Sequence, residues 1–174
     1  MELNLSDAIL ILGKTPACLD LLLRDLPDEW LRATEGQDTW SCYDVVGHLI
    51  HGELTDWIPR IQIILVHGAN RAFVPFDRFA QFRSDQTRPI GDLLDRFKSL
   101  RRQNLQHLAE LHLTPEDWSR AGTHPELGPV TLGQLISSWV VHDLTHLNQI
   151  HRVMAKQYSL AVGPWNQYLS ILNR

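Results

Sequence analysis

Apolar residues recur at spacings of three and four along residues 90–111, at positions 90, 93, 94, 97, 100, 105 and 108. This spacing places them on one face of an α-helix. Three further long stretches are also predicted to be helices, so that the full set is Leu5–Leu26, Ser41–Val66, Ile90–Leu111 and Thr131–Tyr158. No alternation of apolar and polar residues is long enough to predict a strand. The pattern therefore predicts an all-α four-helix bundle with long connecting loops, in a single domain over residues 1–174.

Capping and breaking residues refine these helices. Ser41 opens a capping-box sequence in which Asp44 takes the acidic position, so a helix is expected to start there. Pro16 predicts that the first helix is kinked or begins later, and Pro59 predicts a bend in the second. The basic run RRQNLQHL that starts at Arg101 is expected to form a solvated helix face.

Two long connections separate the helices. Residues 69–86 carry phenylalanines at every third position, for which packing along a helix and a lid over a pocket are the two interpretations; they are Phe73, Phe76, Phe79 and Phe82. Residues 114–130 contain the sequence HPELG. We expect His124 at its start to close this loop by hydrogen bonding.

Composition excludes several classes of protein. The chain has 16 Lys and Arg against 20 Asp and Glu, a net charge of −4, which argues against non-specific binding of nucleic acid. Its two cysteines, Cys18 and Cys42, form no CxxC motif, so neither a disulfide scaffold nor a thiolate zinc site is expected. The N-terminus has no basic region before its short apolar stretch, and no apolar run is long enough to span a membrane. These features predict a cytoplasmic protein without a membrane partner.

The nine histidines of the chain are the candidate metal-ligating residues. His142 and His146 are four residues apart on the fourth helix and share, within about 60°, the face of the apolar residues Leu135, Trp139 and Val153. Two imidazoles one turn apart on an inward face can bind one metal ion, as in HExxH metalloproteases. The glutamate of that motif is absent here, so a metalloprotease of that class is excluded.

A third ligand has to come from another helix. The sequence GHLIHGEL on the second helix offers His48 and His51. Small and polar residues share the face of His48, as is typical of a pocket lining, but the helical angle alone does not exclude His51. A fourth protein ligand such as His51 would favour a closed structural metal site, whereas three ligands leave a position open for catalysis.

Several polar residues near these histidines have two interpretations. Asp44, Asp143 and Gln149 could each accept the second ring N–H of a ligand histidine and so orient it. The alternative is a solvated helix face, or a helix cap in the case of Asp44. Thr55 could line the pocket or lie on a polar face.

The segments WSCYDVVGHLIHGELTDW and GPVTLGQLISSWVVHDLTHLNQIHRVM resemble the DinB-like superfamily of metal-binding four-helix bundles. That superfamily includes YfiT-type metal-dependent hydrolases and bacillithiol- and mycothiol-dependent transferases and isomerases. The resemblance extends from about Trp40 to Met154 and rests on the GHL, HPELG and HDLTH sequences. It implies that His48, rather than His51, joins His142 and His146 in holding one divalent ion, zinc or nickel.

The resemblance also implies a function. It suggests a metal-dependent enzyme that acts on a small molecule, either by transferring a low-molecular-weight thiol such as bacillithiol to an electrophile or by hydrolysis with metal-bound water, and it favours thiol transfer. The catalytic group would be that water or the thiolate, and a homodimer is expected because relatives commonly form one. The alternative is a noncatalytic module whose ion holds the second and fourth helices together.

Overall fold

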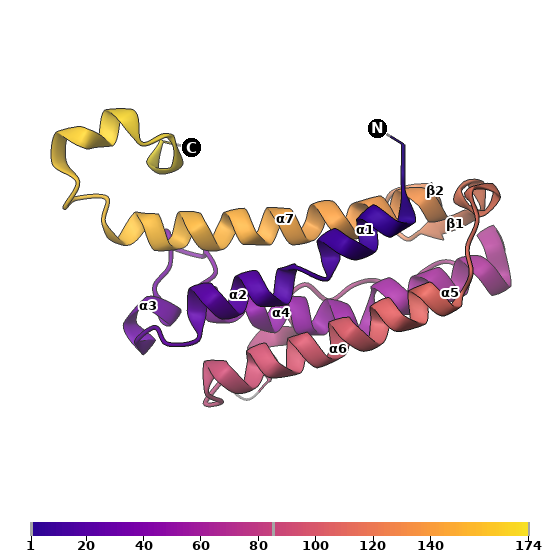
Figure 1. Cartoon of the computed structure of the whole chain (residues 1–174), viewed down its shortest axis with the longest axis horizontal. Coiled ribbons are helices and arrows are strands. Elements are labelled where there is room, and N and C mark those ends of the chain that lie inside the picture. Colours follow the sequence, from indigo (N-terminus) through magenta and orange to yellow (C-terminus); the bar gives the residue numbers. More distant parts are fainter. Residues whose placement is uncertain (1, 85, 174) are drawn as a thin grey trace.

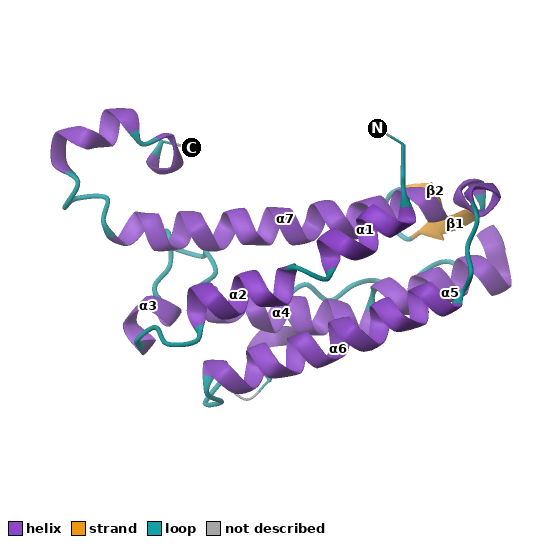
Figure 2. Ribbon diagram, viewed as in Figure 1, coloured by secondary structure: helices purple, strands orange, loops and turns teal. Residues whose placement is uncertain are grey.

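The computed structural model describes residues 2–84 and 86–173 and is mostly helical (Figures 1 and 2). Its α-helices are α1 (Leu5–Leu12), α2 (Thr15–Leu23), α3 (Asp28–Arg32), α4 (Cys42–Thr55), α5 (Trp57–His67), α6 (Ile90–Glu110) and α7 (Leu132–Gln157). The α1–α2 pair, the α4–α5 pair, α6 and α7 lie along one another as the four members of a bundle. The prediction of an all-α four-helix bundle is confirmed.

Two of the predicted helices are interrupted where proline occurs. The first breaks at Gly13–Lys14, and Pro16 then lies in the first turn of α2. The second breaks at Asp56, which puts Pro59 in the first turn of α5. First-turn N–H groups have no partner within their helix, so proline costs little there. Each proline therefore marks the start of a new helix.

Capping boxes fix the starts of the two helices that carry the candidate histidines. The Ser41 hydroxyl accepts from the Asp44 amide, and the Asp44 carboxylate accepts from the Ser41 amide at 2.9 Å. Thr131 and Gln134 make the same reciprocal pair at the start of α7. These bonds set which residues of each helix face the bundle interior.

A short antiparallel hairpin, β1 (Ala121–His124) and β2 (Gly128–Thr131), precedes α7. The expectation that the chain contains no strand is wrong, because each strand has four residues and is too short to show an alternating pattern. A Cβ added at Gly122 would lie 2.7 Å from the Ile64 side chain. Glycine thus lets the hairpin pack directly on α5, where it forms one end of the candidate site.

The core lies between the helices in two apolar clusters. One packs around Leu49 and Phe97, where α4 meets α6. The other packs around Ile61, Leu132 and Trp139, where α5 meets α7. Within residues 2–84 and 86–173 no helix is both long enough and apolar enough to cross a membrane.

Candidate metal centre

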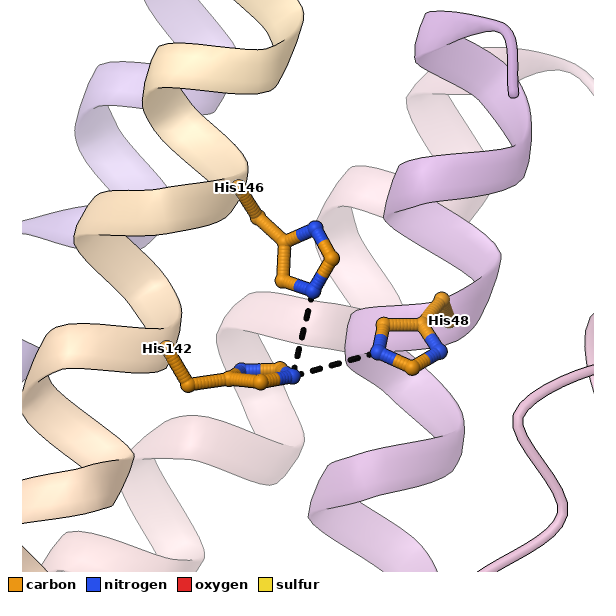
Figure 3. Close-up of side chains that lie close together, drawn as sticks. All are labelled: His48, His142 and His146. Carbon is orange, nitrogen blue, oxygen red and sulfur yellow. Dashed lines mark hydrogen bonds between the residues drawn. The ribbon is translucent and has the colours of Figure 1, made fainter. Parts of the chain in front are cut away.

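Three histidines from two helices converge at one point (Figure 3). His48 comes from α4, and His142 and His146 come from α7. The Nε2 atom of His142 lies 3.1 Å from Nε2 of His48 and 3.1 Å from Nε2 of His146. One ring nitrogen of each histidine lies within 4.8 Å of those of the other two. The three side chains can therefore direct their lone pairs at a common centre.

Burial keeps these histidines neutral. Burial and, secondarily, the neighbouring His146 lower the pKa of His48 to about 3 and that of His142 to about 2. Burial also lowers the pKa of His146. The charge of Arg78 adds to the lowering at His48 and His146. A neutral imidazole has one ring nitrogen free to accept a proton or a metal ion.

Gln149 orients His146. The Gln149 Oε1 atom lies 2.9 Å from Nδ1 of His146, and a carbonyl oxygen can only accept. The proton of His146 is therefore on Nδ1, and the lone pair of Nε2 faces the other two histidines. Three residues were expected to be able to orient a ligand imidazole. Of these, Gln149 makes such a hydrogen bond.

Aromatic rings surround the cluster. The Trp40 ring stacks on His146 at 6.3 Å between centroids and lies 4.8 Å from His48. The edge of Trp57 contacts His142 at 5.1 Å. These contacts restrict the ring orientations and shield the cluster from solvent.

Asp44 and Thr55 do not face the cluster. Asp44 caps α4, as its alternative interpretation holds. The Thr55 hydroxyl donates to the backbone carbonyl of His51 at 2.9 Å on an exposed surface, which is the polar-face interpretation. His51 lies beside Phe76, at 5.0 Å between ring centroids, and does not join the three histidines.

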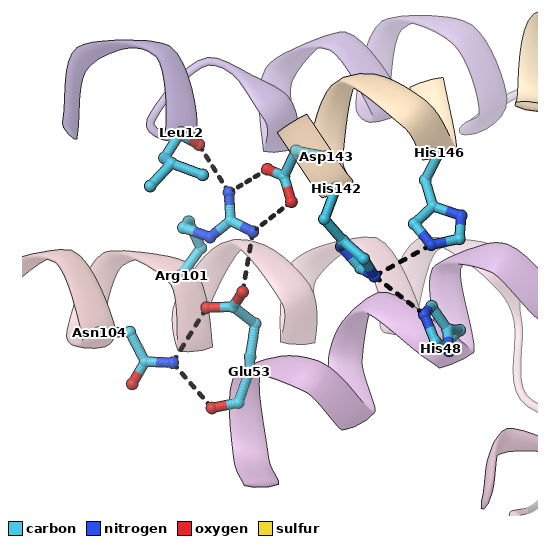
Figure 4. Close-up of polar contacts among 8 residues, drawn as sticks. All are labelled: Leu12, His48, Glu53, Arg101, Asn104, His142, Asp143 and His146. Atoms are coloured by element: carbon cyan, nitrogen blue, oxygen red, sulfur yellow. Dashed lines mark hydrogen bonds and ion pairs between the residues drawn. The ribbon is translucent and has the colours of Figure 1, made fainter. Parts of the chain in front are cut away.

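Asp143 points away from the histidines and belongs to a buried ionic cluster (Figure 4). Both of its oxygens accept from Arg101, at 2.5 and 3.0 Å, and Arg101 also donates to Glu53 at 2.8 Å. The Arg101 side chain is 1% exposed. Both interpretations of Asp143, as a residue that orients an imidazole and as part of a solvated face, are therefore wrong. The expectation of a solvated face at Arg101 is wrong as well. Arg102 is exposed, whereas the side chain of Arg101, the preceding residue of α6, is buried.

A cavity of about 730 Å³ opens beside the three histidines. Its wall also contains Trp40 and three residues that were not predicted to belong to the site, Asp56, Arg60 and Arg78. Asp56 is the break between α4 and α5, and burial raises the pKa of its carboxyl to about 6. A weak signal for Asp56 did exist, because aspartate is common at helix starts, although here its side chain makes no capping bond.

Phe76 is the one residue of the phenylalanine series that lines this cavity. The ring centroid of Phe76 lies 5.4 Å from that of His48. Those of Phe79 and Phe82 lie 6.4 and 6.2 Å from the Trp40 ring. Phe73 is buried against α5. The segment is irregular, with one short 3-10 turn at Ala80–Arg83, so the interpretation as a helical packing stripe is wrong.

The fold and the cluster together define a four-helix-bundle protein with three histidines in the wall of a cavity. The family model of the DinB superfamily matches residues 11–150, and the chain belongs to that superfamily. The chain is similar in structure to YfiT from Bacillus subtilis, described as a probable metal-dependent hydrolase with an unusual four-helix bundle topology. The match has a TM-score of 0.75 and 22% sequence identity, and covers 88% of this chain and 87% of YfiT. A sequence search among curated proteins gives no match.

Proposed function

We propose that His48, His142 and His146 bind one divalent transition metal ion, zinc or nickel. The convergence of three neutral imidazoles carries this proposal. In tetrahedral zinc sites the ligand nitrogens lie about 2.0–2.1 Å from the ion and hence about 3.4 Å from one another. Two of the three Nε2 separations, 3.1 Å each, are close to that value, and the third pair of ring nitrogens lies within 4.8 Å. Imidazole suits both metals.

We further propose that the protein is a metal-dependent enzyme acting on a small molecule in the cavity. An ion held by three histidines supplies a Lewis acid that lowers the pKa of a coordinated water or thiol. Gln149 holds the proton of His146 at Nδ1, and Trp40 and Phe76 exclude water from one side of the cluster. The Asp56 carboxylate lines the same cavity and, with a pKa of about 6, can hold a proton released near neutral pH.

Two reactions fit this arrangement. Hydrolysis agrees with the description of YfiT as a probable metal-dependent hydrolase. Transfer of a thiol to a small electrophile, which the sequence resemblance favours, would need an external thiol such as bacillithiol. Neither cysteine lines the cavity, since Cys18 is exposed elsewhere and Cys42 is buried in the core.

The alternative is a noncatalytic protein with a structural ion. Structural zinc sites usually have four protein ligands. Among the residues that the structure describes, no fourth His, Cys, Asp or Glu joins the three histidines. This favours a metal with an open position, and hence catalysis.

Elemental analysis of untagged protein tests metal binding. We expect about one zinc or nickel per chain in the wild type, and a loss of at least about 100-fold in affinity in His48→Ala and His142→Ala, because two ligands rarely hold a divalent ion. His151→Ala, which changes an exposed histidine of α7, is the control and should keep the metal. No metal after reconstitution at neutral pH would refute the proposal.

Turnover assays then separate the reactions. The metal-loaded protein would be given activated esters and phosphoesters without a thiol, and electrophilic alkyl halides with one. Metal-dependent turnover of the first group supports hydrolysis, and metal- and thiol-dependent consumption of the second supports S-transfer. If neither occurs while metal removal lowers the melting temperature, the structural-ion alternative holds.

A further inference from the structure

Arg60 on α5 is a guanidinium fixed in the wall of the histidine cavity. Its side chain is 9% exposed. Its Nε lies 2.6 Å from Asp56 Oδ1, one turn earlier, and its guanidinium carbon lies 5.1 Å from the centre of the Phe73 ring. One edge and one face of the guanidinium are therefore held in place before any ligand binds.

Within the described residues, the terminal nitrogens of Arg60 make no hydrogen bond to the protein. Over residues 2–84 and 86–173 the ion pair with Asp56 is the one polar contact of this guanidinium. Arg60 is also among the residues that line the cavity. By contrast Arg152, another arginine of the wall, donates from both Nε and Nη2 to Glu35, at 2.9 and 2.5 Å. Arg60 thus keeps terminal N–H donors available to a ligand.

His124 supplies a second donor in the wall of the same cavity, and like Arg60 it contacts the Phe73 ring. Its Nδ1 accepts from the backbone amides of Glu126 and Leu127, both at 3.1 Å, which closes the hairpin turn as predicted. The ring proton is therefore on Nε2, which has no bond to any residue of the described chain. The Phe73 ring contacts both residues, with the His124 ring edge-on at 6.2 Å between centroids. Burial and, secondarily, the charge of Arg60 lower the pKa of His124.

From this arrangement we infer that Arg60 and His124 form an oxyanion-binding subsite, so that the molecule processed at the histidine cluster carries a carboxylate or phosphate group. This inference rests on the proposed function of the cavity. A guanidinium held at one edge presents its remaining N–H groups as a fixed fork that matches two oxygens of such a group. An imidazole N–H in the same cavity wall can donate to another oxygen of the ligand.

Acidic residues of the cavity wall do not cancel this subsite. Asp38 and Glu126 also line the cavity, but both are exposed, so that water and salt screen their charges. Asp56 balances much of the charge of Arg60. Recognition therefore depends mainly on the direction of the N–H donors rather than on net charge.

The test is titration of metal-free, full-length protein with inorganic phosphate and, separately, with acetate, followed by NMR signals of the Arg60 side chain and the His124 ring. In the wild type we expect saturable shifts at both residues. Arg60→Gln should weaken binding at least about 10-fold, because hydrogen bonds to charged groups are lost. Arg60→Lys, which keeps the charge without the fork, should restore only part of the affinity.

Further variants separate the contributions of neighbouring groups. His124→Asn keeps an acceptor near the position of Nδ1 and removes the Nε2 donor, so we expect about 3- to 5-fold weaker binding. Arg71→Gln changes an exposed arginine outside the cavity and should leave binding unchanged. Arg60→Gln combined with Asp56→Asn avoids leaving a buried carboxylate without a partner, and should also lose binding while keeping the wild-type melting temperature.

The outcomes distinguish this inference from the proposed function. Metal content should be equal in Arg60→Gln and the wild type, and anion binding should persist in His142→Ala, which has lost its metal. Tighter binding of phosphate or of acetate would assign the ligand to phosphoryl or carboxylate compounds. No saturable binding to the wild type, equal binding to Arg60→Gln, or binding that depends on Arg78 instead would overturn the inference, whatever the metal analysis shows.

Discussion

Two buried polar clusters lie next to each other between α4 and α7, and they differ in how completely their atoms are paired (Figure 4). In the ionic cluster, both terminal nitrogens of Arg101 make two hydrogen bonds each, to Asp143, Glu53 and the Leu12 carbonyl, while its Nε has no partner in the described chain. In the histidine cluster, Nδ1 of His142 has no partner in the described chain, and the Nε2 atoms face one another beside a cavity. His142 and Asp143 are adjacent on α7, yet His142 belongs to the cluster with unpaired nitrogens and Asp143 to the ion-paired one.

This difference separates a role in folding from a role in binding. A buried charge whose terminal nitrogens are all hydrogen-bonded holds helices at fixed positions, and removing one of its partners is costly. Buried lone pairs without donors contribute little to folding and can bind a ligand that supplies positive charge. The following experiments test this distinction, beginning with the largest expected effect.

Arg101→Met should give the largest loss of stability. It leaves the carboxylates of Glu53 and Asp143 buried without their cation, and breaking a buried ion pair typically costs about 3–5 kcal/mol. Urea unfolding of the metal-free protein would measure the loss. Arg102→Met, at the exposed neighbouring position, should change the free energy of unfolding by less than about 0.5 kcal/mol. Equal effects of the two substitutions would contradict the role assigned to the ionic cluster.

The pH dependence of stability should report the histidine cluster. The folded-state pKa values of His48 and His142, about 3 and about 2, lie below the value of about 6.5 expected in the unfolded chain. The unfolded chain therefore binds more protons below pH 6.5. Their contribution to stability is fully present above that pH and is lost as the pH falls toward 3, by about 1.4 kcal/mol per pH unit for each histidine.

Asp56 changes the stability in the opposite direction as the pH falls, because burial raises the pKa of its carboxyl to about 6. Between pH 6 and 4 its protonation favours the folded state and offsets part of the stability that one histidine loses. The informative quantity is therefore the difference between metal-free wild type and the double variant His48→Gln, His142→Gln. We expect the variant to lose less stability between pH 6.5 and 5, and exposed His151→Gln to behave as the wild type. Parallel curves for all three proteins would argue against burial of neutral histidines.

Gln149→Ala should have a smaller effect, confined to metal affinity. Without the carbonyl that fixes the Nδ1 proton of His146, the affinity for zinc should fall about 10-fold, the lower end of the range for groups that orient metal ligands. Competition with a chromophoric chelator would measure it. Asn148→Ala changes an exposed neighbour and should have no effect; a similar loss there would point to a general change in α7.

Thr55→Ala should have the smallest effect. Its hydroxyl bonds a backbone carbonyl of its own helix outside the cavity, so zinc affinity should change less than about twofold. The same chelator competition applies. A larger change would mean that the polar surface near His51 communicates with the cluster.

The helices and the shared face of His142 and His146 could be predicted from the sequence because helical periodicity is a local property. The choice between His48 and His51 could not, since both lie near the same face and the packing of α4 against α7 decides between them. Arg101 was misjudged for a related reason: a run of basic residues resembles a solvated surface, and only its partners Glu53 and Asp143, distant in sequence, make it buried. Arg60 had no local signal, and Asp56 had only the weak one of an aspartate at a helix start, because the cavity that they line is formed by residues distant in sequence.

The capping box at Thr131 limits where residues can be inserted or deleted as this chain evolves. It starts α7 about three turns before His142, so one residue inserted between them would rotate both histidines by about 100° and carry Asp143 away from Arg101. An insertion at the hairpin turn, after His124 and before Gly128, would leave that spacing unchanged. We therefore expect lineages to differ in the length of the hairpin turn, which borders the cavity, and to keep the length of α7 constant.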